Sequence, residues 1–262
     1  MSVNAPLDVL PLWALLVVTL VGILLAVEGC YRLGRSRGGR SEHEKEAPVG
    51  GMVAAELGLL AFLLAFTFGM AASRFEARRH VLLDETNAIG TAYLRAGLLP
   101  ESHRVEVRRL LREYVDVRLA AVQEGSFEAG MRRSNELHAR LWSEAVAVAE
   151  KDPRSVPTGL FLQAINEVID LHAKRLMLAL RNRIPPTVWT VLLAVAVLSF
   201  GVMGYHEGLT ETSRSPAVLA IVLTFAAVIW LIADLDRPQQ GLLRVSQQPM
   251  IELRNSMAAL SR

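Results

Sequence analysis

The chain has 262 residues, of which 52% are apolar and 21% are charged, and its formal net charge is +2. A charge this close to neutral gives no indication of a nucleic-acid partner. The single cysteine, Cys30, excludes an intrachain disulfide and a CxxC metal or redox motif.

Apolar residues are concentrated in four runs of 17 to 19 residues that contain no Asp, Glu, Lys or Arg. The runs are residues 9–27, 57–73, 187–205 and 216–233. Each is long enough to cross a bilayer as a helix. The alternative, a soluble protein with four buried helices, is disfavoured because charge-free runs of this length are rare in such folds. The sequence therefore predicts an all-α polytopic membrane protein with four transmembrane helices.

These spans divide the chain into four parts. The parts are a first membrane hairpin (1–73, with a basic connector at 28–56), a helical soluble body (74–186), a second hairpin (187–234) and a tail that packs on the body (235–262). The first run lacks the positively charged start of a cleavable signal peptide, so it is expected to remain as a span. Residues 32–45, rich in Gly, Arg, Ser and Glu, are expected to be flexible.

Turn signals divide the body into helices. Pro100-Glu101 begins one helix, Gly125-Ser126 begins a second with Ser126 as its N-cap, and residues 152–157 precede the last. Apolar residues recur at helical spacing in that last segment, and His172 lies among them. This position indicates a packed histidine rather than a metal ligand.

The second apolar run continues directly into residues 74–79, Arg-Phe-Glu-Ala-Arg-Arg. One continuous helix is expected to leave the membrane here and enter the body. The junction resembles the bestrophins, which are pentameric membrane channels. Bacterial bestrophins carry Arg, two aromatic residues and Glu-Ala-Arg-Arg at this place, whereas this chain has one aromatic residue. Asn87-Ala88 falls near the place where bacterial bestrophins often have a similar pair. The tail segments 236–238 and 244–249 resemble those of a bestrophin-like family of bacterial membrane proteins.

The resemblance implies a homo-oligomer, by analogy a pentamer, whose pore is lined by the second span. Its narrow apolar neck would consist of Gly58, Phe62 and Phe66, which share one helix face at i, i+4 and i+8. Bulky apolar rings can gate a pore by dewetting. The alternative is that these phenylalanines contact lipid or a neighbouring helix.

Beyond the neck, Arg74, Arg78 and Arg79 would form positive rings at a cytoplasmic pore mouth and attract anions. Alternatively, they anchor the helix at lipid phosphates. Residues with polar side chains two turns further on are candidates for a vestibule lining, or for an ordinary solvated face. These residues are Asp84, Glu85 and Asn87.

Eukaryotic bestrophins bind calcium through an acidic cluster after the fourth span. Only Asp234 and Asp236 stand there in this chain, and hard cations need six to eight oxygen ligands. We therefore expect no metal ion and no cofactor. Both aspartates are expected to cap the end of the span and to pair with arginines of the body.

Positive charges near the span ends favour a cytoplasmic body and cytoplasmic termini, although the first span alone indicates the opposite orientation. The resemblance to bacterial proteins implies a location in the bacterial inner membrane. No catalytic motif is present, since His206-Glu207 lacks the second histidine of HExxH. The expected function is an ion channel that conducts anions and has the lipid bilayer and inorganic ions as partners. The alternatives are a non-conducting scaffold or regulatory protein with the same fold, and a transporter, which would need polar groups at mid-membrane.

Overall fold

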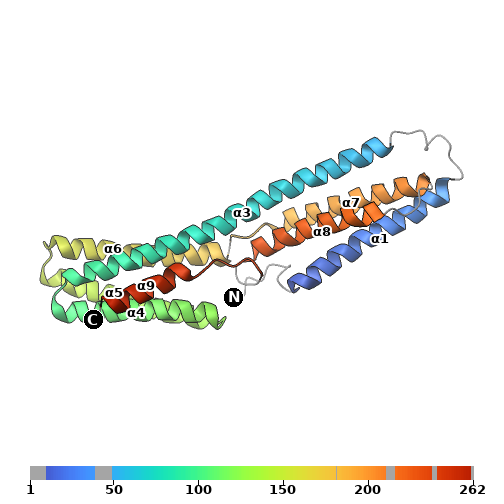
Figure 1. Cartoon of the computed structure of the whole chain (residues 1–262). Helices are drawn as coiled ribbons and strands as arrows, with labels where there is room; N and C mark the ends of the chain where they lie inside the picture. Colours follow the sequence, from blue (N-terminus) through green and yellow to red (C-terminus); the bar gives the residue numbers. More distant parts are fainter. Residues whose placement is uncertain (1–9, 39–48, 181, 211–215, 238–240, 261–262) are drawn as a thin grey trace. The chain divides into compact units, whose positions relative to one another are not determined.

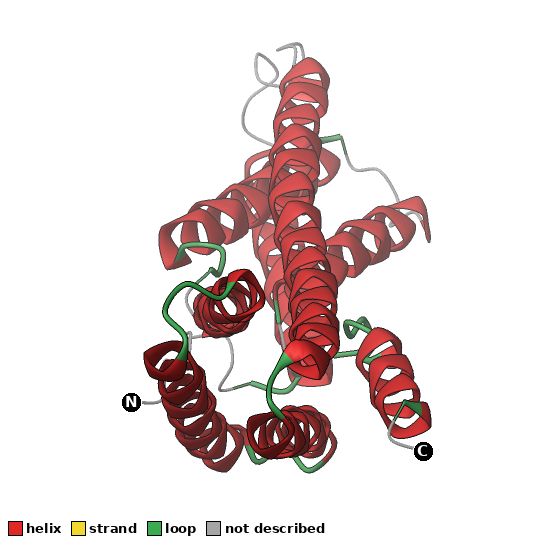
Figure 2. Ribbon diagram, turned by 90° about the vertical axis from the view of Figure 1, so that its left-hand side faces the viewer, coloured by secondary structure: helices red, strands yellow, loops and turns green. Residues whose placement is uncertain are grey.

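The computed structural model describes residues 10–38, 49–180, 182–210, 216–237 and 241–260, and within these ranges every regular element is a helix (Figure 2). The chain divides into two compact units. The span unit comprises residues 1–75 and 180–244, and the body unit comprises residues 76–179 and 245–262. The predicted all-α fold class is confirmed.

The span unit contains the helices that are apolar enough to cross a membrane. Among the described residues there are four such helices, as predicted. They are α1 (Leu12–Gly38), α3 (Val49–Arg95, which continues into the body unit), α7 (Pro186–Leu209) and α8 (Pro216–Asp236). Leucine, isoleucine and aromatic side chains from all four helices form one buried core, in which the rings of Phe200 and Phe225 meet edge to face at 5.5 Å.

Helices α1 and α7 lie side by side in close contact (Figure 1). Glycines on α7 make this approach possible. A Cβ atom at Gly204 would overlap the carbonyl oxygen of Val27, and one at Gly208 would overlap that of Tyr31. Small residues at such spacing let two membrane helices approach backbone to backbone, where van der Waals packing stabilises the pair.

The prediction of a flexible segment at residues 32–45 is wrong for its first part, because α1 continues to Gly38. Two contacts explain the extension. Arg32 Nε donates to Glu28 Oε1 at 2.7 Å, one helical turn away, and the backbone at Gly34 packs against that of Tyr205 on α7. The rest of the segment lies outside the described residues, as does residue 9 of the predicted first span.

Helix α3 runs without interruption from Val49 to Arg95. It contains no proline, and it crosses from the span unit to the body unit at residues 75 and 76. The prediction of one continuous helix at this junction is therefore confirmed. A short 3₁₀ turn, η2 (Ala96–Leu98), follows it.

The body unit adds helices α4 (Glu101–Gln123), α5 (Phe127–Lys151) and α6 (Val156–Leu180), whose starts agree with the predicted turn signals. Gly125 adopts a φ of 68° between α4 and α5, a conformation that glycine reaches without strain. Ser126 stands at the N-cap position of α5, but its hydroxyl does not cap the helix. It donates instead to Glu124 Oε2 at 3.4 Å.

The tail returns to the body unit as α9 (Gln248–Ala259), which packs against α4. Met250 and Met257 are its buried side chains. The Tyr93 hydroxyl of α3 donates to the Met257 carbonyl oxygen at 3.1 Å. These contacts join α9 to the hydrophobic core of this unit.

Candidate functional site

The membrane part of α3 has one packed face and one open face. Leu60 and Leu64 are buried in the core of the span unit. The predicted neck residues Gly58, Phe62 and Phe66 lie in a row away from that core, and the two phenylalanines are 67% and 62% exposed. The chain therefore leaves an aromatic row of α3 uncovered.

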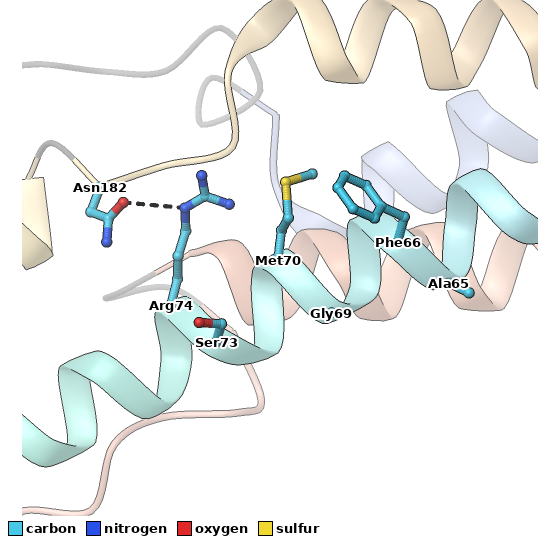
Figure 3. A pocket seen from close by; sticks show the side chains of 7 residues that line it. All are labelled: Ala65, Phe66, Gly69, Met70, Ser73, Arg74 and Asn182. Carbon is cyan, nitrogen blue, oxygen red and sulfur yellow. Dashed lines mark hydrogen bonds between the residues drawn. The ribbon is translucent and has the colours of Figure 1, made fainter.

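A groove begins at the end of this row (Figure 3). Its volume is about 620 Å³. The residues that line it are Ala65, Phe66, Gly69, Met70, Ser73, Arg74 and Asn182. Phe66, Met70 and Arg74 are spaced one turn apart, so the groove changes from apolar to cationic along the helix (Figure 3).

The three arginines predicted to form a pore mouth have different surroundings. Arg74 lines the groove, and its Nε donates to Asn182 Oδ1 at 3.2 Å. Arg78 is buried, so its charge does not face open solvent in this chain. Arg79 is exposed and pairs with Glu76 at 3.2 Å.

The three vestibule candidates also differ. Asp84 and Asn87 are exposed, whereas Glu85 is 0% exposed. Glu85 therefore belongs to the interior of the body unit and does not lie on its surface. Its neighbours Leu82 and Ile89, at i−3 and i+4, are buried on the same face of α3.

Glu85 is surrounded by donors from α4 and α6. The Tyr114 hydroxyl donates to Glu85 Oε1 at 2.7 Å. Arg118 Nε lies 3.5 Å from Oε1, and Arg175 Nε lies 3.2 Å from Oε2. Two guanidinium groups thus oppose one carboxylate. Such a buried group is stable only while its partners remain.

Two histidines complete this cluster. His172 Nδ1 lies 3.0 Å from the Tyr114 hydroxyl, and the ring of His138 from α5 meets that of His172 at 4.8 Å. Burial, followed by the influence of His172 and Arg118, lowers the pKa of His138 to about 4. Burial and the nearby Glu85 raise the pKa of Tyr114 well above its usual value. His172 is packed, as predicted. We did not predict from the sequence that His172, His138, Tyr114 and Glu85 would form one cluster.

The carboxylates after the fourth span are bound by protein donors. Asp236 pairs with Arg183 Nε at 3.0 Å and accepts from the Ile184 N–H at 2.9 Å. Asp234 accepts from the N–H groups of Leu242 and Leu243 at 2.9 and 3.0 Å. The predicted arginine pairing is confirmed for Asp236, whereas Asp234 binds the tail backbone instead. In the part of the chain that the structure describes, no group of three or more His, Cys, Asp and Glu is arranged to hold a metal ion.

Four hydroxyl side chains within the spans bond to the protein itself. The hydroxyls of Thr67, Thr190 and Thr224 each donate to the carbonyl oxygen four residues earlier, at 2.7 to 3.0 Å. The Ser199 hydroxyl lies 3.3 Å from a carboxylate oxygen of Glu56. The threonines bond within their own helices and Ser199 bonds to a neighbouring helix, so these hydroxyls give no support to the transporter alternative.

A comparison with protein families places most of the chain in one group. The model of the bestrophin-like domain matches residues 11–250. No curated protein and no solved structure matches the chain.

Proposed function

This chain belongs to the bestrophin-like family, and on that premise we propose that it forms a homo-oligomeric ion channel whose pore is lined by α3. A single subunit has too few spanning helices to enclose a hydrated path, so conduction requires assembly. The family resemblance favours five subunits in a bacterial inner membrane, with the body unit in the cytoplasm.

The observation that carries the proposal is the uncovered row of Gly58, Phe62 and Phe66 on α3. Around a symmetry axis, this row would make successive rings of apolar side chains. Water leaves a narrow apolar constriction, and ions then cannot pass. The two phenylalanines would be the narrow neck, and Gly58 would widen the pore at its far end because it has no side chain.

Charge on the same helix supports conduction of anions. Arg74 follows the aromatic row at the end of the groove, and Arg79 is exposed one to two turns further on. Rings of positive charge raise the local concentration of anions. Asp84 and Asn87, both exposed, would line the vestibule beyond them.

The test is ion flux through the purified protein in liposomes, with chloride and potassium recorded separately. Phe66→Ala widens the proposed neck and should raise the flux about tenfold, equivalent to a barrier lower by about 1.4 kcal/mol. Phe68→Ala is the matched control, because Phe68 is on the same helix, 39% exposed, but turned away from the row. An absence of flux from stable oligomers of all variants would favour the non-conducting scaffold instead.

A further inference from the structure

We infer that Arg74, held in place by Asn182, forms a binding site for a small monovalent anion at the cationic end of the groove. Its role in conduction rests on the proposed channel function. This site differs from the predicted pore mouth of three arginines. It assigns the selectivity to Arg74 alone and adds Asn182, from another segment, as a positioning residue. Four observations support it.

The first is the orientation of the guanidinium group. Asn182 lies in the segment between α6 and α7, 108 positions along the chain from Arg74. Its side-chain oxygen accepts a hydrogen bond from Arg74 Nε at 3.2 Å (Figure 3). A guanidinium is planar and rigid, so a hydrogen bond at Nε restricts the directions of both Nη groups.

The second observation is a donor without an acceptor. Arg74 Nη1 is buried and has no hydrogen-bond partner among the described residues. A buried N–H group on a cation is unfavourable until an acceptor reaches it. Arg74 lines the groove, and a bound anion would supply this acceptor once the guanidinium turns Nη1 toward the groove.

The third observation is that no carboxylate neutralises the positive charge of Arg74. In the described part of the chain, no carboxylate lies within ion-pair distance of Arg74, whose side-chain partner is a neutral amide. By contrast, Arg79 pairs with Glu76, and Arg78 is buried. The charge of Arg74 is therefore directed into the groove without compensation.

The fourth observation concerns the kind of anion. The other walls of the groove are largely apolar, formed by Ala65, Phe66 and Met70, with Ser73 as a further polar residue. One guanidinium group with apolar neighbours suits a single, weakly hydrated charge such as chloride. A phosphate group would leave most of its oxygens without donors here.

Two substitutions test the site in the full-length protein. Arg74→Gln removes the charge. Asn182→Asp keeps the shape of the side chain but places a carboxylate beside Arg74, which neutralises the guanidinium. The control is Arg35→Gln, since Arg35 is an exposed arginine at the end of α1. All variants are first checked for an unchanged melting temperature and oligomer size.

Chloride binding is measured as protein-dependent broadening of the ³⁵Cl NMR line in detergent micelles. The site predicts that both Arg74→Gln and Asn182→Asp lose the broadening, whereas Arg35→Gln retains it. Broadening that persists in both variants would overturn the inference. This readout does not depend on conduction, so it holds even for a protein that passes no ions.

Selectivity is measured as the reversal potential in a chloride gradient across planar bilayers. We expect Asn182→Asp to lower the chloride-to-potassium permeability ratio while current persists. A measurable current with an unchanged chloride-to-potassium permeability ratio would contradict the role of this site in selectivity. An absence of current in every variant would instead refute the proposed channel, and the NMR result alone would then decide whether the anion site exists.

Discussion

The Tyr114 hydroxyl donates a 2.7 Å hydrogen bond to Glu85 Oε1, and both side chains are fully buried in the body unit. Glu85 also lies within 3.5 Å of Arg118 and Arg175, so α3, α4 and α6 meet at one carboxylate. A charged cluster in a helical core stabilises the fold only when it is complete, because each member compensates the buried charge or dipole of another.

Replacing Glu85 should strongly destabilise the body unit. Glu85→Gln leaves the buried guanidinium group of Arg118 and the partly buried one of Arg175 without their counter-charge, which costs about 3 kcal/mol of the free energy of unfolding. Thermal unfolding in detergent micelles measures the loss. Asp84→Asn, at the exposed neighbouring position, should leave the melting temperature nearly unchanged. Equal melting temperatures for Glu85→Gln and the wild type would contradict the stabilising role of this carboxylate.

Tyr114→Phe should destabilise the body unit less than Glu85→Gln does. The substitution removes a hydrogen bond to a charged acceptor while keeping the ring in place, and it should cost about 2 kcal/mol. If Tyr114 and Glu85 act through this one hydrogen bond, the double variant with Glu85→Gln should lose less than the sum of the single losses. Additive losses would show that the two side chains stabilise the unit independently.

Acid should weaken the body unit through His138. Its pKa in the folded protein is about 4, below the ordinary value of 6.5, so the unfolded chain takes up a proton first as the pH falls. The contribution of His138 to the free energy of unfolding should therefore be constant above pH 6.5, fall by about 3 kcal/mol between pH 6.5 and 4, and level off below that.

This pH dependence can be assigned with one substitution. His138→Asn should flatten the curve of melting temperature against pH between pH 6.5 and 4, although its overall stability will be lower. His80→Asn serves as the control because His80 is exposed on α3. A curve for His138→Asn as steep as that of the wild type would show that another group is responsible.

The close contact between α1 and α7 leads to a prediction for the span unit. Gly204→Ala introduces a Cβ that overlaps the Val27 carbonyl oxygen, and separating the helices should cost about 2 kcal/mol. Gly29→Ala is the matched control, since a Cβ at Gly29 would meet nothing within 4 Å. Midpoints of unfolding in a detergent titration compare the two. Equal midpoints would contradict the inferred backbone contact.

The membrane helices and the continuity of α3 could be predicted because they depend on local sequence. Charge-free runs set the spans, and helical residues without proline join residue 73 to the basic segment. The end of α1 could not be predicted, because residues 32–38 are mostly polar residues and glycines. They become helical through the pair between Glu28 and Arg32 and through contact with α7. Tertiary contacts there override a composition typical of a loop.

The buried cluster could not be found from one segment. Glu85 stands on the apolar stripe between Leu82 and Ile89, which is a signal for burial that the prediction of a vestibule overlooked. Its partners come from two other helices, α4 and α6, at positions such as 118 and 175 that look like ordinary surface arginines in sequence. Only the packing of those helices brings them together.

The most direct test of the channel is a cysteine at the proposed neck. The chain has one native cysteine, so Cys30→Ala provides a background in which a new thiol is unique. In bilayer recordings of Phe66→Cys in this background, a charged thiol reagent should block or sharply change the current, because the modified side chain lies in the pore. The same reagent on Phe68→Cys should have no effect. Modification of Phe66→Cys without any change in current would contradict a pore lined by this face of α3.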